Sequence, residues 1–520
     1  MRKKRYRMLS AVLLPACMIT MAGCQETPDQ SAVVSREGGL SEEVIAEPLA
    51  EGETQTIELP DQWEQTETWS NDRWIFRADV DLESIETGNL PVVEMEQHAM
   101  TQEELEKLTD YFAGGEELYV PLLTTKEACQ EKLDRMRNME GIYAVYTIDT
   151  VMNDKLEWLE KGLEAAVEAG TQEPQEAEVS FGPRADDPAE DAMTDRRKYI
   201  SEEEDALELY FSADVGADRT GSITARKYDP ETGRSSQFEW MAGDEIVYQK
   251  NDIDYYRDWH KLYAEVSETD RQWEALLDEC TRIMTEENID PEEGRQQVEA
   301  VLKDLGIEDK VYAGEEAVLW FPQGTYPEDI ASTYQDSLWQ SDLSQAEAGY
   351  VYTFLNEISG QPVDLQSGGQ FFGISDEAES ESYNPPFPVE SITVAVTESG
   401  VKMFSWDGMC SETGTEAENV KILPFDEMKE RIIQRISYLF PVSQPADDTT
   451  LFQYELLDLS FGYSYVTAYE NPDHAWAVPA WFLELGTGDN SPELTGTEEV
   501  ESTAWSYMTF NAMDGSVIEN

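Results

Sequence analysis

A β-hairpin is predicted most clearly by the stretch Ser391-Ile392-Thr393-Val394-Ala395-Val396-Thr397-Glu398-Ser399-Gly400-Val401-Lys402-Met403-Phe404-Ser405-Trp406. Its first half alternates apolar side chains with small or polar ones, and apolar and aromatic side chains return in its second half. Between the halves, Glu398-Ser399-Gly400 has the composition of a turn. Because β-branched and aromatic residues suit a pleated, half-buried surface, these residues indicate an antiparallel sheet.

Downstream of the hairpin, the sequence predicts one helix and three further strands. Residues 425–438 carry apolar side chains at helical spacing, which indicates a helix with one buried face. Strand-like runs of apolar and aromatic residues follow at 451–468, 475–485 and 505–511. The C-terminal third is therefore expected to be a sheet with one helix packed on it.

Two upstream helices are marked by their capping residues. Thr101 followed by Glu104 forms a capping box at the start of one helix. The other begins with Asp290 as N-cap and Pro291 in the first turn, and Gly306 ends it. Helices of this kind between strand-like runs indicate mixed secondary structure.

These elements predict an α+β fold with two or three domains of mixed or antiparallel sheet and helices packed on one face. Acidic, proline-containing stretches near residues 171–197 and 375–388 supply the boundaries. The expected parts are an N-terminal α+β domain at 61–170, an acidic linker or loop at 171–197, a middle α+β domain at 198–380 and a C-terminal α+β domain at 386–520.

The N-terminus resembles a bacterial lipoprotein signal. A basic start at residues 2–7 precedes an apolar stretch from Met8, and the small residues Ala22 and Gly23 lead to Cys24. The resemblance implies a signal peptide at 1–23, diacylglycerol on Cys24, and attachment to the extracellular face of the cell membrane. Two alternatives are weaker: an ordinary cleavage site would leave Cys24 as a free thiol, and lipidation at Cys17 would put proline in the recognition sequence.

Residues 24–60 are expected to form a lipidated, disordered tether. From position 25 onward this segment holds nine carboxylates and one basic residue, Arg36. With 36 residues, its mean reach would be about 33 Å.

The chain is strongly acidic. It contains 109 Asp and Glu against 36 Lys and Arg, and since five of the basic residues lie in positions 1–23, signal removal would leave a net charge of −78. Such a surface repels nucleic acid phosphates, so nucleic acid is not an expected partner. Solvated acidic faces explain most of this charge, although it would also attract cationic peptides or wall polymers. Acidic loops at 186–191 and 202–205 could associate weakly with divalent cations.

The sequence assigns no catalytic residue, cofactor or metal site. His98, His260 and His474 are far apart, and neither a zinc motif, a nucleophile elbow nor a phosphate-binding loop is present. With 109 acids, however, a catalytic carboxylate pair can be neither identified nor dismissed.

After Cys24, three cysteines remain, Cys129, Cys280 and Cys410, and an odd number at such spacing implies no disulfide framework. A single bridge between two of them stays open. No later segment is apolar over the length that a membrane span needs.

Three motifs carry a further resemblance. They are residues 418–426, Val478-Pro479-Ala480-Trp481-Phe482, and residues 510–518. Together they resemble an uncharacterised family of lipoproteins from Gram-positive gut anaerobes, and the last two are similar to the final strands of PepSY and YycH/YycI-type extracytoplasmic domains. The resemblance implies inhibitory or sensory binding at the envelope by a PepSY-like C-terminal domain.

These motifs also have structural explanations. Pro479 suits a strand start or edge, Trp481 supplies core, and Asn511 with Asp514-Gly515 suits a turn that closes a hairpin.

Three tryptophans are weak candidates for ligand contact: Trp406, Trp476 and Trp481. Stacked indole rings could hold a sugar or peptide, although core packing is the more common use. The function expected is a non-enzymatic module for envelope binding, sensing or regulation, with an envelope protein, peptide or wall polymer as partner. The alternatives are a carboxylate-dependent extracellular hydrolase and a solute-capture or scaffold lipoprotein.

Overall fold

The computed structural model describes residues 56–69, 74–82, 85–86, 89–137, 149–184, 187–193, 209–219, 221–229, 235–243, 246–250, 253, 268–321, 343–363, 387–439, 452–468, 471–489 and 504–518. The predicted signal peptide, Cys24 and most of the predicted tether lie outside these residues, as do 202–205.

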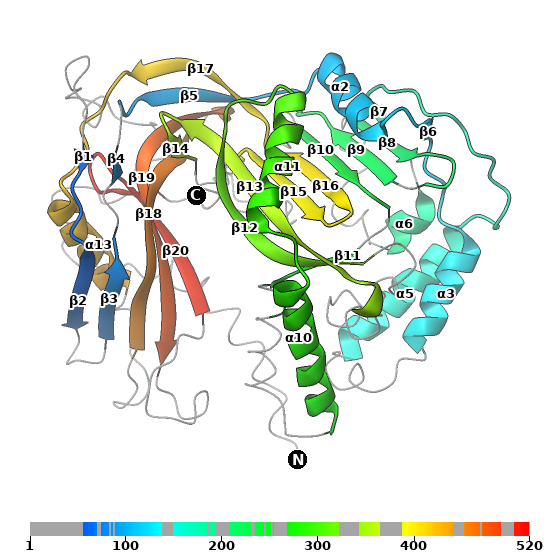
Figure 1. The fold of residues 1–520 in the computed structure, drawn as a ribbon, viewed down its shortest axis with the longest axis horizontal. Coiled ribbons are helices and arrows are strands. Elements are labelled where there is room, and N and C mark those ends of the chain that lie inside the picture. The colour runs from blue at the N-terminus through cyan, green and yellow to red at the C-terminus, as the bar shows by residue number, and fades with distance from the viewer. Residues whose placement is uncertain are drawn as a thin grey trace.

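The larger sheet has eleven strands (Figure 1). In spatial order they are β11 (Ile246–Gln249), β12 (Lys310–Phe321), β13 (Glu347–Ile358), β15 (Ser391–Thr397), β16 (Gly400–Asp407), β10 (Gln237–Met241), β9 (Gly221–Arg226), β8 (Leu209–Val215) and β6 (Leu118–Tyr119), with β14 (Gln361–Pro362) beside β13 and β7 (Gly182–Pro183) beside β8. The predicted hairpin is the β15–β16 pair, in which Ile392 faces Trp406 and Val394 faces Phe404.

The smaller sheet has eight strands. They are β17 (Cys410–Ala417), β5 (Val92–Gln97), β19 (Asn471–Asp489), β18 (Phe452–Ala468), β3 (Trp74–Asp81) and β2 (Gln62–Trp69) in spatial order, with β20 (Ala504–Asn511) beside β19 and β21 (Val517–Ile518) beside β20. The β18–β3 pair is parallel and the other pairs are antiparallel, so the sheet is mixed. A separate short pair joins β1 (Thr56–Ile57) to β4 (Ile85–Glu86).

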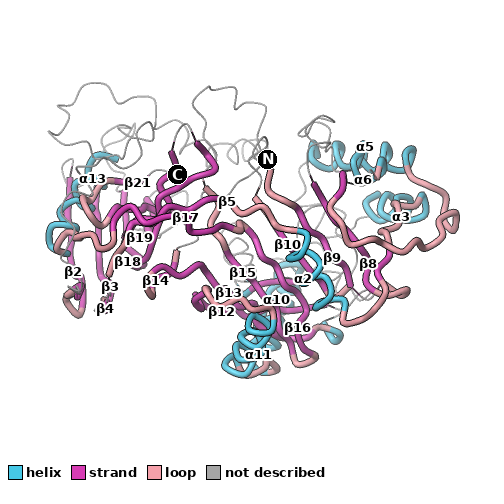
Figure 2. The backbone as a smooth tube through the Cα atoms, turned by 90° about the horizontal axis from the view of Figure 1, so that it is seen from above, coloured by secondary structure: helices cyan, strands magenta, loops and turns pink. Residues whose placement is uncertain are grey.

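Three of the described helices, α2 (Gln102–Ala113), α10 (Glu268–Glu286) and α11 (Pro291–Asp304), cover one face of the larger sheet. The other described helices are α3 (Lys126–Arg137), α5 (Asp149–Ala165), α6 (Pro188–Met193) and α13 (Phe425–Leu439), with a 3-10 turn, η1 (Leu343–Gln345). Apolar residues of α2 and α11 share one core with Phe238, Phe354 and Phe404 of the sheet. Helix α10 packs on Leu319 and Phe321 further along the sheet, and Figure 2 shows α10 and α11 on the same side.

Helix α13 covers the smaller sheet. Its residues Met428, Ile432 and Ile436 are fully buried in a core that includes Trp63 and Trp481. The predicted periodicity of residues 425–438 therefore describes the helix that forms.

The predicted caps are present. Thr101 accepts a hydrogen bond from the Glu104 backbone N–H, and the Glu104 side chain accepts one from the Thr101 N–H, which completes the capping box. Asp290 accepts from the N–H groups of residues 292 and 293, and Gly306 follows the helix with φ of 67°. These local signals placed both helix starts correctly.

The α+β fold class is confirmed by these two sheets and their helices. The predicted domain boundaries, in contrast, do not separate the sheets. Strands β2, β3 and β5, from the stretch expected as an N-terminal domain, pair with one another or with β17, β18 and β19 from the C-terminal stretch. The hairpin β15–β16, also from that C-terminal stretch, pairs with β10 and β13 in the larger sheet. Each sheet is therefore assembled from distant segments, which local composition does not report.

The three resemblance motifs meet in the smaller sheet. The N–H of Leu423 donates to the carbonyl of Ala512, and the N–H of Ala512 donates to the carbonyl of Pro479. The predicted turn forms, since β20 and β21 pair and the Gly515 N–H donates to the Asn511 carbonyl. These contacts give the motifs a structural role at one junction.

Pro479 lies inside β19, not at the start or edge predicted from the sequence. On one side of β19, pairing with β5 ends at Ala477 and pairing with β20 begins at Ala480. Proline is tolerated at this break because no ladder hydrogen bond from its nitrogen is required there.

Candidate functional site

Three polar side chains lie in a row across one end of the larger sheet. Lys310, the first residue of β12, faces Asn356 of β13. Leu355 faces Ser391, so Glu390, one residue before β15, lies beside Asn356 on its other side. The Lys310 Nζ is 3.3 Å from Asn356 Oδ1 and 3.4 Å from Glu390 Oε2.

This row is removed from solvent. The side chains of Lys310 and Glu390 are each 2% exposed, and Asn356 is 6% exposed. The Lys310 ammonium also contacts Asp309, whose side chain is 71% exposed, at 2.9 Å. A buried ammonium and carboxylate therefore share one small volume with a primary amide.

Side chains from both sheets complete the network. The indole nitrogen of Trp406 in β16 donates to Glu390 Oε1 at 2.8 Å. The Cys410 Sγ at the start of β17 is 3.4 Å from Glu390 Oε2 and 3.5 Å from the hydroxyl of Tyr465 in β18, and it accepts from Asn356 Nδ2 at 3.4 Å. Because β17 and β18 belong to the smaller sheet, this network connects the two sheets.

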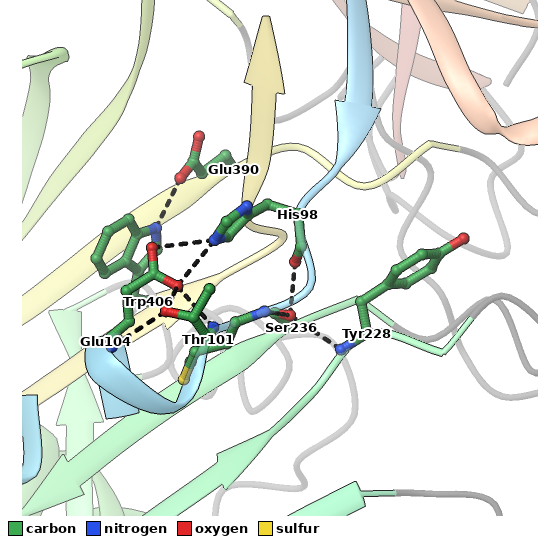
Figure 3. A network of polar contacts seen from close by, with 8 residues as sticks. His98, Thr101, Glu104, Tyr228, Ser236, Glu390 and Trp406 are labelled. Atoms are coloured by element: carbon green, nitrogen blue, oxygen red, sulfur yellow. Dashed lines mark hydrogen bonds and ion pairs between the residues drawn. The ribbon is translucent and has the colours of Figure 1, made fainter. Parts of the chain in front are cut away.

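A second branch begins at His98, just after β5 (Figure 3). Its Nε2 lies 2.9 Å from Glu104 Oε2, which links it to α2. Its backbone N–H donates to the Met409 carbonyl, and its own carbonyl accepts from the Ser236 hydroxyl at 2.6 Å. Residue 98 thus joins the end of a smaller-sheet strand to a helix and to the entry of β10.

Burial dominates the electrostatics of the first branch, which is the network around Glu390 that Lys310 and Cys410 join. It raises the pKa of Glu390, an effect that the nearby Lys310 opposes. Burial also raises the pKa of the Cys410 thiol and the pKa of the Tyr465 hydroxyl far above their usual ranges. Burial therefore favours the protonated form of the Glu390 carboxyl group.

In the second branch, hydrogen bonding dominates. The hydrogen bond to Glu104 raises the pKa of His98. Burial opposes ionisation of Glu104, but the hydrogen bonds from His98 and Thr101 prevail and lower its pKa to about 2. The His98–Glu104 contact is therefore an ion pair when the imidazole is protonated.

Two further carboxylates share the opposite face of the larger sheet. Glu239 of β10 faces Ser405, and Asp407 of β16 faces Gln237, so the two acids are diagonal neighbours. Burial raises the pKa of each, and their mutual repulsion adds to the effect at Glu239. Raised carboxylate pKa values are a property of many acid–base catalysts.

The structure places the three candidate tryptophans apart. Trp406 lies in the network of the larger sheet, whereas Trp476 and Trp481 lie in β19 of the smaller sheet. Trp476 is half-buried, and Trp481 is 1% exposed and packs against Phe425 and Phe461. Trp481 has its expected core role, and the three rings do not form one surface.

The three described cysteines are free thiols, which answers the question of a disulfide. Cys129 and Cys280 lie in separate apolar clusters, and Cys410 lies in the network. In the predicted acidic loop at 186–191, Asp187 caps α6 and accepts hydrogen bonds from Thr124. Within the described ranges, no group of three or more His, Cys, Asp or Glu is placed to hold a metal ion. None of the described helices is long and apolar enough to cross a membrane.

Sequence reasoning missed Lys310, Asn356 and Glu390. One weak signal exists, since Glu390 directly precedes the apolar hairpin at 391–406 and Lys310 directly precedes Val311-Tyr312. A charged residue at such a position is usually solvated, so only the strand pairing identifies these as buried.

Comparisons with known proteins add little. No protein-family model matches the chain, and no curated protein matches it. The chain is similar to the crystal structure of an uncharacterized protein from Eubacterium rectale, with 12% identity and a TM-score of 0.39 over 89% of this chain and 94% of that one. A similarity of this size supports no functional argument. The resemblance to the lipoprotein family and to PepSY and YycH/YycI-type domains stays a prediction.

Proposed function

We propose that the protein is a lipid-anchored binding protein on the extracellular face of the cell membrane, where it serves envelope sensing or regulation. The observation that carries this proposal is the N-terminal order of basic residues, apolar stretch, Ala22-Gly23 and Cys24. The described fold begins at Thr56, beyond the expected lipid site.

The expected partner is cationic. The whole chain has a net charge of −73, which attracts basic groups and repels nucleic acid and anionic headgroups. A basic segment of an envelope protein, a cationic peptide or a basic wall polymer fits this charge.

Membrane attachment can be tested with two matched cysteine variants of the full chain expressed in a Gram-positive host. Cys24→Ala should move the protein from the detergent phase to the aqueous phase after phase separation. Cys17→Ala, which removes the alternative lipid site, should leave it in the detergent phase. Retention of the Cys24→Ala protein with the detergent would refute the anchor.

Partner binding needs its own test. Cross-linking on intact cells, followed by affinity capture of the full chain, should recover a basic partner whose yield falls steeply as salt is raised. A recovered partner whose binding does not respond to salt would refute the electrostatic part of the proposal.

A hydrolase is the second candidate, favoured by the Glu239 and Asp407 pair with raised pKa values. If it is correct, Glu239→Gln and Asp407→Asn should each abolish turnover of a cell-wall or glycan substrate, whereas Glu412→Gln, at an exposed position of β17, should not. Equal turnover in all three variants would eliminate this pair as the catalytic group.

A further inference from the structure

The row Lys310, Asn356 and Glu390 brings together an amine, a carboxamide and a carboxyl group. The amine nitrogen lies at contact distance from both partners, 3.3 Å from the amide oxygen and 3.4 Å from a carboxyl oxygen. Strand pairing fixes this arrangement, because Lys310 and Asn356 are directly opposite residues of β12 and β13.

We infer that Lys310 and Asn356 become joined by an intramolecular amide bond, with Glu390 as the group that moves the protons. This is a covalent modification of the chain by itself, and it does not rest on the function proposed above.

The reaction balances without an added reagent. The Lys310 ammonium first gives a proton to the Glu390 carboxylate, which leaves a neutral amine. Its Nζ attacks the Asn356 Cγ, and a new C–N bond forms. The Cγ–Nδ2 bond then breaks, Glu390 returns a proton to Nδ2, and ammonia leaves. The second proton of Nζ passes to Glu390, which ends as a neutral acid. The product is a secondary amide, and nothing is oxidised or reduced.

Three features of the surroundings favour the reaction. A lysine amine is a good nucleophile when it is desolvated and neutral, and the Lys310 side chain is 2% exposed. The Trp406 ring, whose centre lies 5.9 Å from Lys310 Nζ, instead stabilises the charged form. Burial raises the pKa of Glu390, so the protonated acid is readily formed. Because the fold holds the amine and the amide next to each other, the reaction is an intramolecular step and needs no collision between separate molecules.

The contacts of the remaining atoms are compatible with the reaction. The Asn356 Nδ2, which leaves as ammonia, donates a weak hydrogen bond to Cys410 Sγ at 3.4 Å, and the Asn356 side chain also hydrogen-bonds the Tyr465 hydroxyl. The Trp406 indole holds the other Glu390 oxygen at 2.8 Å and so fixes the orientation of the carboxyl group. Asp309 is the competing partner, because its carboxylate stabilises the charged form of Lys310 at 2.9 Å.

Peptide mapping of the folded full chain tests the inference directly. A protease that cleaves after glutamate should release residues 309–315 and 348–357 as one joined species, whose mass is the sum of the two peptides less one ammonia. Recovery of the two as separate, unmodified linear peptides would overturn the inference. This measurement uses the unmodified sequence, so it does not depend on whether any variant folds.

Three variants assign the roles. Lys310→Arg removes the nucleophile while keeping the charge, since a guanidinium stays protonated. Glu390→Gln removes the proton carrier with little change in shape. Both should yield only separate peptides, whereas the exposed control Lys303→Arg should still yield the joined species. A joined species in the Glu390→Gln protein would refute the role of Glu390.

Discussion

The contact between His98 and Glu104 should make stability depend on pH in a defined window. Glu104 has a folded-state pKa of about 2 against an ordinary value of 4.5. Its contribution is therefore fully present above about pH 4.5 and is lost as the pH falls toward 2. The pKa of His98 is raised, so its contribution is present below 6.5 and is lost as the pH rises through the higher folded-state value. The pair should stabilise most between about pH 4.5 and 6.5.

The size of this stabilisation follows from how far the pKa of Glu104 is lowered and from how exposed the two side chains are. A depression of roughly 2.5 pKa units corresponds to about 3 kcal/mol. The side chains of His98 and Glu104 are 31% and 42% exposed, so solvent screens the interaction. A contribution of about 1–2 kcal/mol remains after that discount. Glu104→Gln removes the charge, yet glutamine can still serve in the capping box. The decrease in the free energy of unfolding therefore reports mainly the ion pair.

Urea unfolding followed by tryptophan fluorescence at pH 3, 5.5 and 9 measures this effect. The matched control is Glu103→Gln, which removes an exposed charge from the same first turn of α2. Relative to this control, the Glu104→Gln protein should unfold at lower urea at pH 5.5, and the difference should shrink at pH 3. A difference that is equal at all three pH values would refute the assignment.

Three further outcomes are expected. Gly294→Ala should destabilise the protein by about 1–3 kcal/mol in thermal melts, because the added Cβ would lie 2.1 Å from the Tyr352 hydroxyl, and this clash outweighs the higher helix propensity of alanine. An unchanged or higher melting temperature would contradict the packing of α11 on β13. Cys410 should react with a thiol reagent far more slowly in the native protein than in urea, since burial raises its pKa; equal labelling rates would show that the network opens freely. Glu390→Gln should prevent the Lys310–Asn356 cross-link and lower the free energy of unfolding by about 4 kcal/mol, the value for opening a loop whose ends are 46 positions apart. Denaturation curves that coincide with those of the wild type would argue against the cross-link.

The elements that the sequence predicted well are those with local causes. The β15–β16 hairpin follows from alternation around one turn, and the starts of α2 and α11 follow from Thr101 and Asp290, whose side chains bond to N–H groups two or three residues away. In each case the decisive interaction joins residues that are close in the chain.

The arrangement of the sheets and the polar network have non-local causes. Strand β5 pairs with β17 and β19, more than 300 residues away, and no composition signal carries that pairing. Glu390 is one of 109 acidic residues, and nothing in its immediate sequence distinguishes it from a solvated one. Trp406 was identified as a ligand candidate, but its partner Glu390 became visible only when β15 and β16 were placed side by side.

The energetics of the buried row favour the amide bond over a permanent ion pair. Burying an ammonium and a carboxylate costs several kcal/mol for each ion, and their attraction offsets this cost only when the geometry is excellent. Here the Lys310 Nζ is 3.4 Å from Glu390, longer than the roughly 2.7–2.9 Å of a strong charge-assisted hydrogen bond, so this pair offsets the cost only in part. Amide formation removes the charge of Lys310 altogether and leaves Glu390 as a neutral acid, the form that burial already favours. A carboxylate at position 356 would have given Lys310 a third counter-ion beside Asp309 and Glu390, whereas Asn356 instead offers it a neutral carbonyl carbon to attack.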